Sequence, residues 1–351
     1  MLFMKRKKTL PADFEEILKR GDIEEIRNVL EKCEVDAHKP YEKKTVLFFA
    51  ELPEEIIRYL VLERGTDINQ LSQHNNTALA EHAFSHPEHI PLFIELGADV
   101  NYYEGFGSTP IHQVAGFHRV EGVRELLKYG ADPSIRCGWY KDNAMEHTLK
   151  TCRNIDICNT AVIAEMLIEK GITVTEEMKK EVVRIGTDFE FYRSEMTPES
   201  VEEIEPELQK LYDLFSVSPV PKKQVYDGKT PITVKSDTWQ KQHEELWNML
   251  VPGKGQANTV QGEVIRIIGK ISCEILDNGA INWDKEYKKL TTALTGYLQM
   301  GKPVEKDVLL IAKGICADSD EDELYWLCEA CVKWVLANPN PIGLDSVDYK
   351  R

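Results

Sequence analysis

The sequence lacks the features that define several large classes of protein. It has no run of 18 apolar residues, so we expect no membrane-spanning helix. Residues 1–8 place basic side chains after a very short apolar run, an order that a secretory signal does not have. The eight cysteines show no framework of spacings, which predicts reduced thiols and a cytoplasmic protein. With only 16 prolines and 21 glycines in 351 residues, the chain is expected to be folded.

Common catalytic motifs are also missing. The loop Gly253-Lys254-Gly255-Gln256 lacks the rest of a phosphate-binding G-x-x-x-x-G-K-[ST] motif. Trp247 stands where a zinc protease beginning at His243 needs its second histidine, and no G-x-S-x-G is present. We therefore predict no catalytic residues, no cofactor and no enzymatic activity.

Two groups of residues have spacings that metal sites also use. Cys328 and Cys331 form a C-x-x-C pair, but they fall on an apolar stripe at helical spacing and predict core positions. His82, His86 and His89 would need one continuous helix to share a metal, and a proline at position 87 interrupts it. We predict no metal site.

The chain is strongly acidic, with a formal net charge of −16. This charge disfavours nucleic acids and anionic membranes as partners and favours a basic protein surface. An alternative is that the charge serves solubility alone. Part of it lies in Glu199–Glu207, which suits the acid-rich first turn of a helix.

A phrase recurs four times in the first half. Gly65, Gly97, Gly130 and Gly171 each follow an apolar segment at helical spacing, and they lie 32, 33 and 41 residues apart. A threonine opens three of the units, and the third opens with Thr109-Pro110-Ile111-His112. Threonine suits a helix N-cap, and glycine suits the left-handed residue that ends a helix.

These phrases and their period resemble ankyrin repeats, in which one helical pair per repeat stacks on the next. The resemblance implies a helical solenoid that binds other proteins. A charged helical pair over residues 14–30 suits an N-terminal cap, and the last unit is expanded around Cys152–Cys158. We predict an all-α fold: an ankyrin-type solenoid followed by a compact helical domain. The predicted regions are a basic tail (1–9), the capped repeats (10–174), a helical connector with a Pro/Gly-containing strap (175–235), an α-helical domain (236–338) and a C-terminal tail (339–351).

The predicted second domain contains apolar stripes and five of the six tryptophans. On its long helix, Glu263, Arg266, Lys270 and Glu274 alternate in charge and predict a solvated ion-pair face. An alternative makes Gln261, Glu263, Arg266 and Asn282 the lining of a polar ligand-binding or catalytic pocket.

Two of the predicted repeat tips are unusually aromatic. Because Tyr, Trp and Arg are enriched at interface hot spots, we predict a protein-binding patch there. It comprises Tyr102, Tyr103, Phe106, Arg136, Trp139 and Tyr140. Alternatively, these rings fold down onto a neighbouring repeat or the second domain.

Degenerate repeats followed by a helical tail containing Leu246–Pro252 and Val260–Arg266 resemble bacterial ankyrin-repeat proteins of unassigned function. Some bacterial ankyrin proteins neutralise toxins as immunity proteins, which implies a protein partner here. The sequence leaves three functions open: a protein-binding, immunity-like module, a ligand-binding or catalytic helical domain addressed by the repeats, and an effector acting on host proteins.

Overall fold

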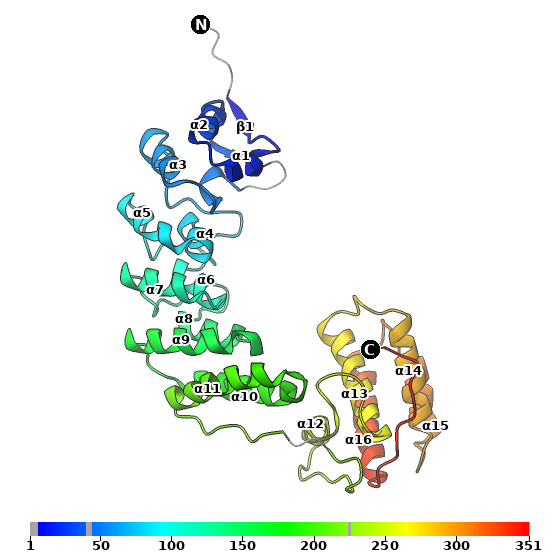
Figure 1. Ribbon diagram of the computed structural model, residues 1–351. Helices are drawn as coiled ribbons and strands as arrows, with labels where there is room; N and C mark the ends of the chain where they lie inside the picture. The colour runs from blue at the N-terminus through cyan, green and yellow to red at the C-terminus, as the bar shows by residue number, and fades with distance from the viewer. Residues whose placement is uncertain (1–5, 40–43, 224–225, 351) are drawn as a thin grey trace. The chain divides into compact units, whose positions relative to one another are not determined.

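The computed structural model describes residues 6–39, 44–223 and 226–350 (Figure 1). It is 57% helix and 5% strand, so the predicted all-α class is confirmed. Contacts divide the chain into two compact units, residues 1–188 with 198–220 and residues 189–197 with 221–351. We call them the repeat unit and the helical unit. Residues 1–5 of the predicted tail, Val225 of the strap and Arg351 lie outside the described residues.

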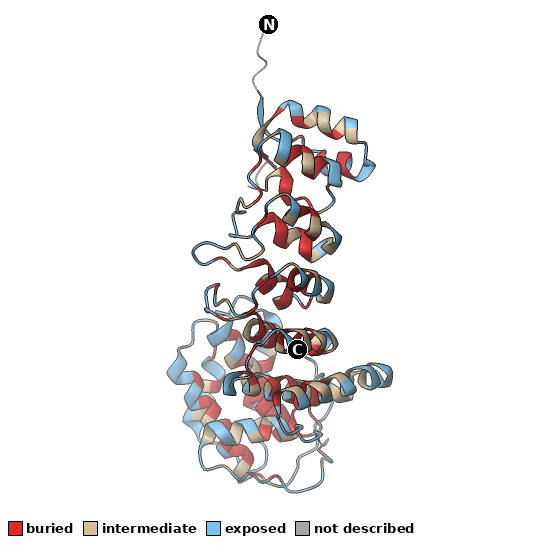
Figure 2. Cartoon of the chain, turned by 90° about the vertical axis from the view of Figure 1, so that its left-hand side faces the viewer, coloured by how far each residue is buried: buried red, intermediate tan, exposed pale blue. Residues whose placement is uncertain are grey.

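Helices of the repeat unit follow one another in pairs, and each pair stacks on the next (Figure 1). Residues buried by this stacking lie along the helices in Figure 2. The strands β1 (Lys7–Thr9) and β2 (Cys33–His38) pair in parallel beside the first helices. The pairs are α1 (Phe14–Arg20) and α2 (Ile23–Glu31), η1 (Val46–Phe48) and α3 (Glu54–Arg58) with η2 (Tyr59–Glu63), α4 (Ala78–Ser85) and α5 (Ile90–Glu95), α6 (Pro110–Gly116) and α7 (Val120–Lys128), α8 (Ala144–Thr151) and α9 (Ile157–Glu169), and α10 (Glu176–Tyr192) and α11 (Pro198–Phe215).

The last pair differs from the prediction, which places residues 175–215 in a connector. In the structure α11 packs against α9, and most of α10 belongs with α11 to the repeat unit. Helices α10 and α11 approach closely because Gly186 on α10 has no side chain. A Cβ atom at this position would collide with the hydroxyl of Tyr212 on α11. Leu208, Leu211 and Phe215 are buried, so this pair extends the stacked core beyond residue 174.

Helix starts and stops follow the residues that recur in sequence. Thr77 and Thr109 accept hydrogen bonds from the backbone N–H groups of Ala80 and His112, at 3.2 and 3.4 Å. Asn143 takes the same position in the expanded unit and forms a reciprocal capping box with Glu146. The glycines at the opposite ends have positive φ; Gly130, for example, has φ 90°. Each therefore stops its helix in a conformation that side chains disfavour.

The turns between repeats are joined by a ladder of side chain-to-backbone hydrogen bonds. Asn69 accepts a bond from the N–H of Asp99 at 2.9 Å, and Asn101 accepts one from the N–H of Asp132 at 2.8 Å. Within each turn, the aspartate accepts a bond from the N–H two residues later. The recurring Asp-x-Asn pattern therefore fixes each turn to the next.

Buried histidines add further contacts between repeats. His82 is fully buried, with Nε2 3.0 Å from the Leu47 carbonyl and Nδ1 2.9 Å from Nδ1 of His89. His112 lies with Nδ1 3.4 Å from the Cys137 sulfur of the following repeat. Burial lowers the pKa of His82 to about 3 and that of His112 to about 4, so both rings are neutral at pH 7.

The helical unit surrounds α13, most of whose residues are buried. This helix packs against α12, α14 and α16, while α15 packs against α14 and α16. Cys328 and Cys331 are buried in the core of this unit. Its helices are α12 (Trp239–Leu250), α13 (Val260–Ser272) with η6 (Cys273–Asp277), α14 (Lys285–Tyr297), α15 (Lys306–Gly314) and α16 (Glu321–Ala337).

The predicted solvated ion-pair face on α13 is wrong. Glu263, Arg266 and Glu274 are 0%, 2% and 4% exposed. The C-terminal segment covers the helix, and the Tyr349 hydroxyl donates to Glu263 at 2.7 Å. Glu274 instead accepts a bond from the N–H of Asn282 at 2.6 Å. A charge pattern along one helix does not reveal that a distant segment covers it.

The segment after α16 is built into the helical unit by backbone hydrogen bonds. Val260 donates to the Ile342 carbonyl at 2.8 Å, and Ile232 donates to the Pro339 carbonyl at the same distance. Gln261 on α13 donates to the carbonyls of Asn338 and Asn340, both at 2.8 Å. The strap and the C-terminal segment therefore hold each other against the core.

Candidate protein-binding site

Two neighbouring tips of the repeat unit lie next to each other at the predicted patch. The first precedes α6, and the second precedes α8. Gly138 N–H donates to the Gly107 carbonyl at 3.0 Å, and Thr109 N–H donates to the Cys137 sulfur at 3.4 Å. A Cβ atom on Gly107 would lie 2.8 Å from the Asn75 carbonyl, so only glycine fits this close approach. These contacts fix the spacing between the tips.

One aromatic side chain from each tip contacts the aromatic side chain of the other tip. The ring centroids of Phe106 and Trp139 are 4.8 Å apart, and their planes are inclined by 45°. Nevertheless Phe106 remains 66% exposed and Trp139 71% exposed. The two rings therefore support each other while most of their surface faces solvent.

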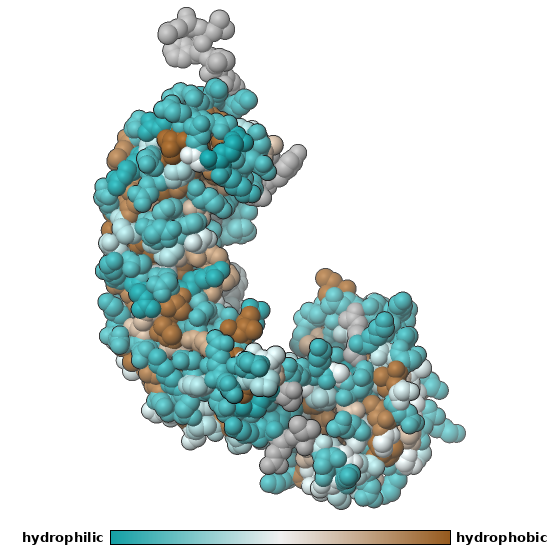
Figure 3. Space-filling model, in the orientation of Figure 1, coloured by the Kyte–Doolittle hydropathy of each residue, from teal (hydrophilic) through white to brown (hydrophobic). Residues whose placement is uncertain are grey.

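Tyr140 and Tyr103 extend the exposed aromatic surface. Tyr140 is 77% exposed, and Tyr103 is 38% exposed. The Lys150 amine lies 5.9 Å from the Tyr140 ring centroid and forms an ion pair with Asp142 at 2.8 Å. The face in Figure 3 is mostly hydrophilic, with hydrophobic side chains in separate patches. An exposed cluster of rings on two adjacent tips is a chemical feature that protein interfaces use.

The other two predicted residues are engaged locally. Arg136 forms a two-bond ion pair with Glu146, at 2.6 and 2.7 Å. Glu146 also closes the capping box of α8, so this pair ties the second tip to its helix. Tyr102 donates a hydrogen bond to Glu104 on its own tip. Phe106 and Trp139 thus contact each other across the two tips, while Arg136 and Tyr102 hold their own tips in shape.

Glu146 was not among the predicted residues. Its position three residues after Asn143 is the capping-box spacing and was a detectable signal. The ion pair with Arg136 was not detectable, because the seven residues 137–143 of irregular backbone separate Arg136 from the helix that carries Glu146.

Acidic charge is concentrated in the repeat unit. This unit contains 38 Asp and Glu against 25 Lys and Arg, whereas the helical unit contains 21 against 18. Asp99 and Asp132 of the turn ladder precede the two aromatic tips directly. The exposed rings therefore lie within an acidic unit.

Possible metal ligands and cysteine thiols are distributed as follows among the described residues. No group of three or more potential ligands from His, Cys, Asp and Glu is found within residues 6–39, 44–223 and 226–350. All eight cysteines are free thiols, and burial raises the pKa of Cys152 to about 12, so this thiol stays protonated.

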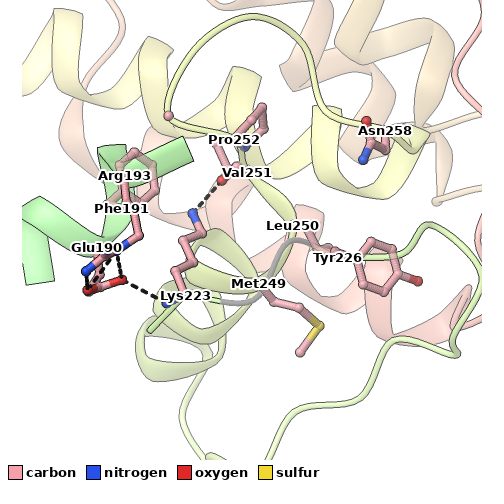
Figure 4. Close-up of a pocket in the computed structure, with 11 residues that line it drawn as sticks. Glu190, Phe191, Arg193, Lys223, Tyr226, Met249, Leu250, Val251, Pro252 and Asn258 are labelled. Carbon is pink, nitrogen blue, oxygen red and sulfur yellow. Dashed lines mark hydrogen bonds and ion pairs between the residues drawn. The ribbon is translucent and has the colours of Figure 1, made fainter. Parts of the chain in front are cut away.

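A small pocket in the helical unit is shown in Figure 4. It encloses about 130 Å³. The Lys223 amine donates to the Val251 carbonyl at 2.8 Å and lies 3.8 Å from the Phe191 ring centroid. Glu190 accepts a bond from the Lys223 backbone N–H. Lys223 and Glu190 in this pocket therefore already have hydrogen-bond partners within the chain. The volume of the pocket is below that of a typical ligand site.

The alternative polar pocket does not form as predicted. Gln261 bonds to the C-terminal segment, and Glu263 accepts bonds from Tyr349, the Ala257 N–H and Arg266. Asn282 bonds to Glu274. Glu274 lies about 16 Å along the helix axis from Glu263, given a rise of 1.5 Å per residue. The four predicted residues therefore do not line one cavity.

Comparison with protein families gives a match to one part of the repeat unit. Residues 94–147 match the family model for ankyrin repeats (many copies). The match spans α6, α7, both aromatic tips and the first turn of α8. Ankyrin repeats generally mediate binding to other proteins. A search of curated proteins found no match to the chain. Among the described residues, no helix is long and apolar enough to cross a membrane.

Proposed function

We propose that this chain is a non-enzymatic protein-binding module whose aromatic tips contact the partner. The observation that carries the proposal is the Phe106–Trp139 pair, which is largely exposed and joins two neighbouring tips. Burial of these two adjacent rings in a complex would remove their apolar area from water and so stabilise the complex. The match of residues 94–147 to ankyrin repeats supports the same reading.

The partner surface is basic. An excess of acidic residues in the repeat unit attracts a positively charged surface and repels nucleic acids and anionic membranes. Exposed aromatic rings beside carboxylates also suit arginine and lysine side chains, which can stack on a ring while pairing with an acid. Complex formation is therefore expected to weaken as salt concentration rises.

The finer role is neutralisation or regulation of that partner, as in a bacterial immunity protein. This reading rests on the resemblance drawn from the sequence and on the acidic repeat unit. Rescue of cells that express a candidate toxin would support it. An effector role on host proteins remains the alternative, and it predicts export of the chain.

Comparative pull-down tests the site. Four baits are compared: the unaltered chain, Phe106→Ala, Trp139→Ala and the double variant. The proteins captured by each bait are quantified by mass spectrometry. We expect a partner whose recovery falls at least tenfold with the double variant, since hot-spot truncations cost about 2 kcal/mol or more each.

Phe117→Ala is the matched control, because Phe117 is also 66% exposed and lies in the repeat unit. Recovery should be unchanged by this variant. Equal recovery by the double variant and the unaltered chain, with both folded, would reject the patch.

A further inference from the structure

A second cavity lies in the helical unit beside the small pocket of Figure 4, with which it shares Phe191, Val251, Pro252 and Gly253. It is lined by residues of α12, the loop after that helix, α13 with Cys273, Lys350 near the C-terminus, and Phe191 and Tyr192 at the end of α10. The groove encloses about 730 Å³. Cavities of roughly 300–1,000 Å³ accommodate small-molecule ligands and cofactors. The groove therefore has the size of a ligand site, although the chain shows no enzyme motif.

Charge in the groove is opposite to that of the whole chain. Lys254, Lys270 and Lys350 line it, and Glu244 is the acidic residue among its lining. Lys270 also interacts with another group of the chain. Arg266 also reaches it, with its charge balanced by Glu263 at 2.9 Å. A cluster of amines in a chain of net charge −16 favours an anionic group at this position. Lysine amines commonly bind phosphate as point charges.

Aromatic rings form another side of the groove. The Trp247 ring lies 6.2 Å from the His243 ring and 6.4 Å from the Phe191 ring, with interplanar angles of 27° and 11°. All three residues belong to the helical unit and line the groove. Trp247 can lie against α13 because position 269 is glycine; a Cβ atom there would be 2.4 Å from its ring. The near-parallel rings provide a surface on which a planar ligand can stack.

One polar atom in this wall is left without a partner. Nε2 of His243 is buried and has no hydrogen-bond partner among the described residues. Burial also lowers the pKa of His243, so the ring is neutral at pH 7.

We propose that this groove binds a nucleoside monophosphate, with the phosphate near the lysines and the planar base against Trp247 and His243. The ligand class follows from the three features together: amines for a phosphate, parallel rings for a base, and a volume that admits both. The site is separate from the aromatic tips, so it stands or fails independently of the proposed protein-binding function.

Isothermal titration calorimetry of the full chain with AMP, GMP and UMP tests the proposal, with inorganic phosphate titrated in parallel. We expect saturable binding of at least one nucleotide, and binding of phosphate weaker by roughly tenfold or more. No binding of any nucleotide at millimolar concentration, or equal binding of phosphate, would overturn it.

Single substitutions test which residues bind the phosphate and which bind the base. Lys254→Gln and Lys270→Gln are each expected to weaken nucleotide binding by roughly tenfold. Trp247→Leu should weaken nucleotide binding but leave phosphate binding unchanged. Lys313→Gln on α15 is the matched control, because Lys313 is an exposed lysine of the same unit that does not line the groove.

Thermal melts by circular dichroism establish that each variant is folded. Unchanged affinity in folded Lys254→Gln and Lys270→Gln would place the nucleotide elsewhere and reject the groove. A 5′-phosphorylated hexanucleotide is titrated as well. Tighter binding of the hexanucleotide than of every monophosphate would make the ligand a strand end and overturn the proposal of a free nucleotide.

Discussion

The repeat unit and the helical unit differ in how far apart in sequence the partners of their side-chain hydrogen bonds lie. In the repeat unit, Asn69 and Asn101 bond to backbone groups 30 and 31 residues later. In the helical unit, Gln261 and Glu263 bond to groups 77 and 86 residues later. Stability of stacked repeats is nearly a sum over neighbours. The helical unit, by contrast, depends on its C-terminal segment for the partners of buried charges.

The comparison predicts its largest effect at Glu263. Glu263→Ala leaves Arg266 buried without its carboxylate partner, which is expected to cost about 3–5 kcal/mol of the free energy of unfolding. Urea denaturation followed by tryptophan fluorescence measures this loss, because five of the six tryptophans lie in the helical unit.

Replacing both charges is the control for Glu263→Ala. The double variant Glu263→Leu with Arg266→Leu removes both members of the buried ion pair, so it should be less destabilised than Glu263→Ala. An unchanged urea midpoint for Glu263→Ala would show that the buried pair does not support the helical unit.

Acidification is expected to have an intermediate effect, centred on the repeat unit. Histidine in an unfolded chain has a pKa near 6.5, whereas burial lowers that of His82 to about 3. Because the unfolded chain takes up the proton first, stability is complete above about pH 6.5 and falls as the pH drops toward 3. By pH 5, His82 alone is expected to cost about 2 kcal/mol.

The measurement is the free energy of unfolding at pH 7 and pH 5. His82→Gln cannot take up the proton, so its loss between these pH values should be smaller by about 2 kcal/mol. A variant that loses as much stability as the unaltered chain would contradict the assignment to His82.

The smallest effect is expected at a helix cap. Asn143→Ala removes the capping box of α8 and should lower the free energy of unfolding by about 1 kcal/mol. Asp284 caps α14 in the helical unit, and Asp284→Ala should cost a similar amount there. Urea denaturation of each variant, followed by far-UV circular dichroism, measures both losses. An unchanged urea midpoint for Asn143→Ala would contradict a stabilising role of the capping box.

Most of the repeat architecture was predictable because its signals are local. Thr109 marks a helix start and Gly130 a helix end within one repeat, so the period appears directly in the sequence. The charged row on α13 was misjudged for the opposite reason. Nothing within one helix indicates that Tyr349 will reach Glu263 from 86 residues away.

The candidate site was predictable in part. Aromatic residues in turns identified Phe106 and Trp139, whose rings meet in the structure. The sequence did not show that Arg136 pairs with Glu146, because this contact depends on the path of the tip. The groove beside Trp247 was also missed, since its lining comes from segments that only the fold brings together.

Hydrogen–deuterium exchange of the chain with and without its captured partner tests the central claim most directly. The account predicts that the partner slows exchange at the backbone amides of residues 102–107 and 136–141. Unchanged exchange at both tips, with protection only elsewhere in the chain, would contradict it.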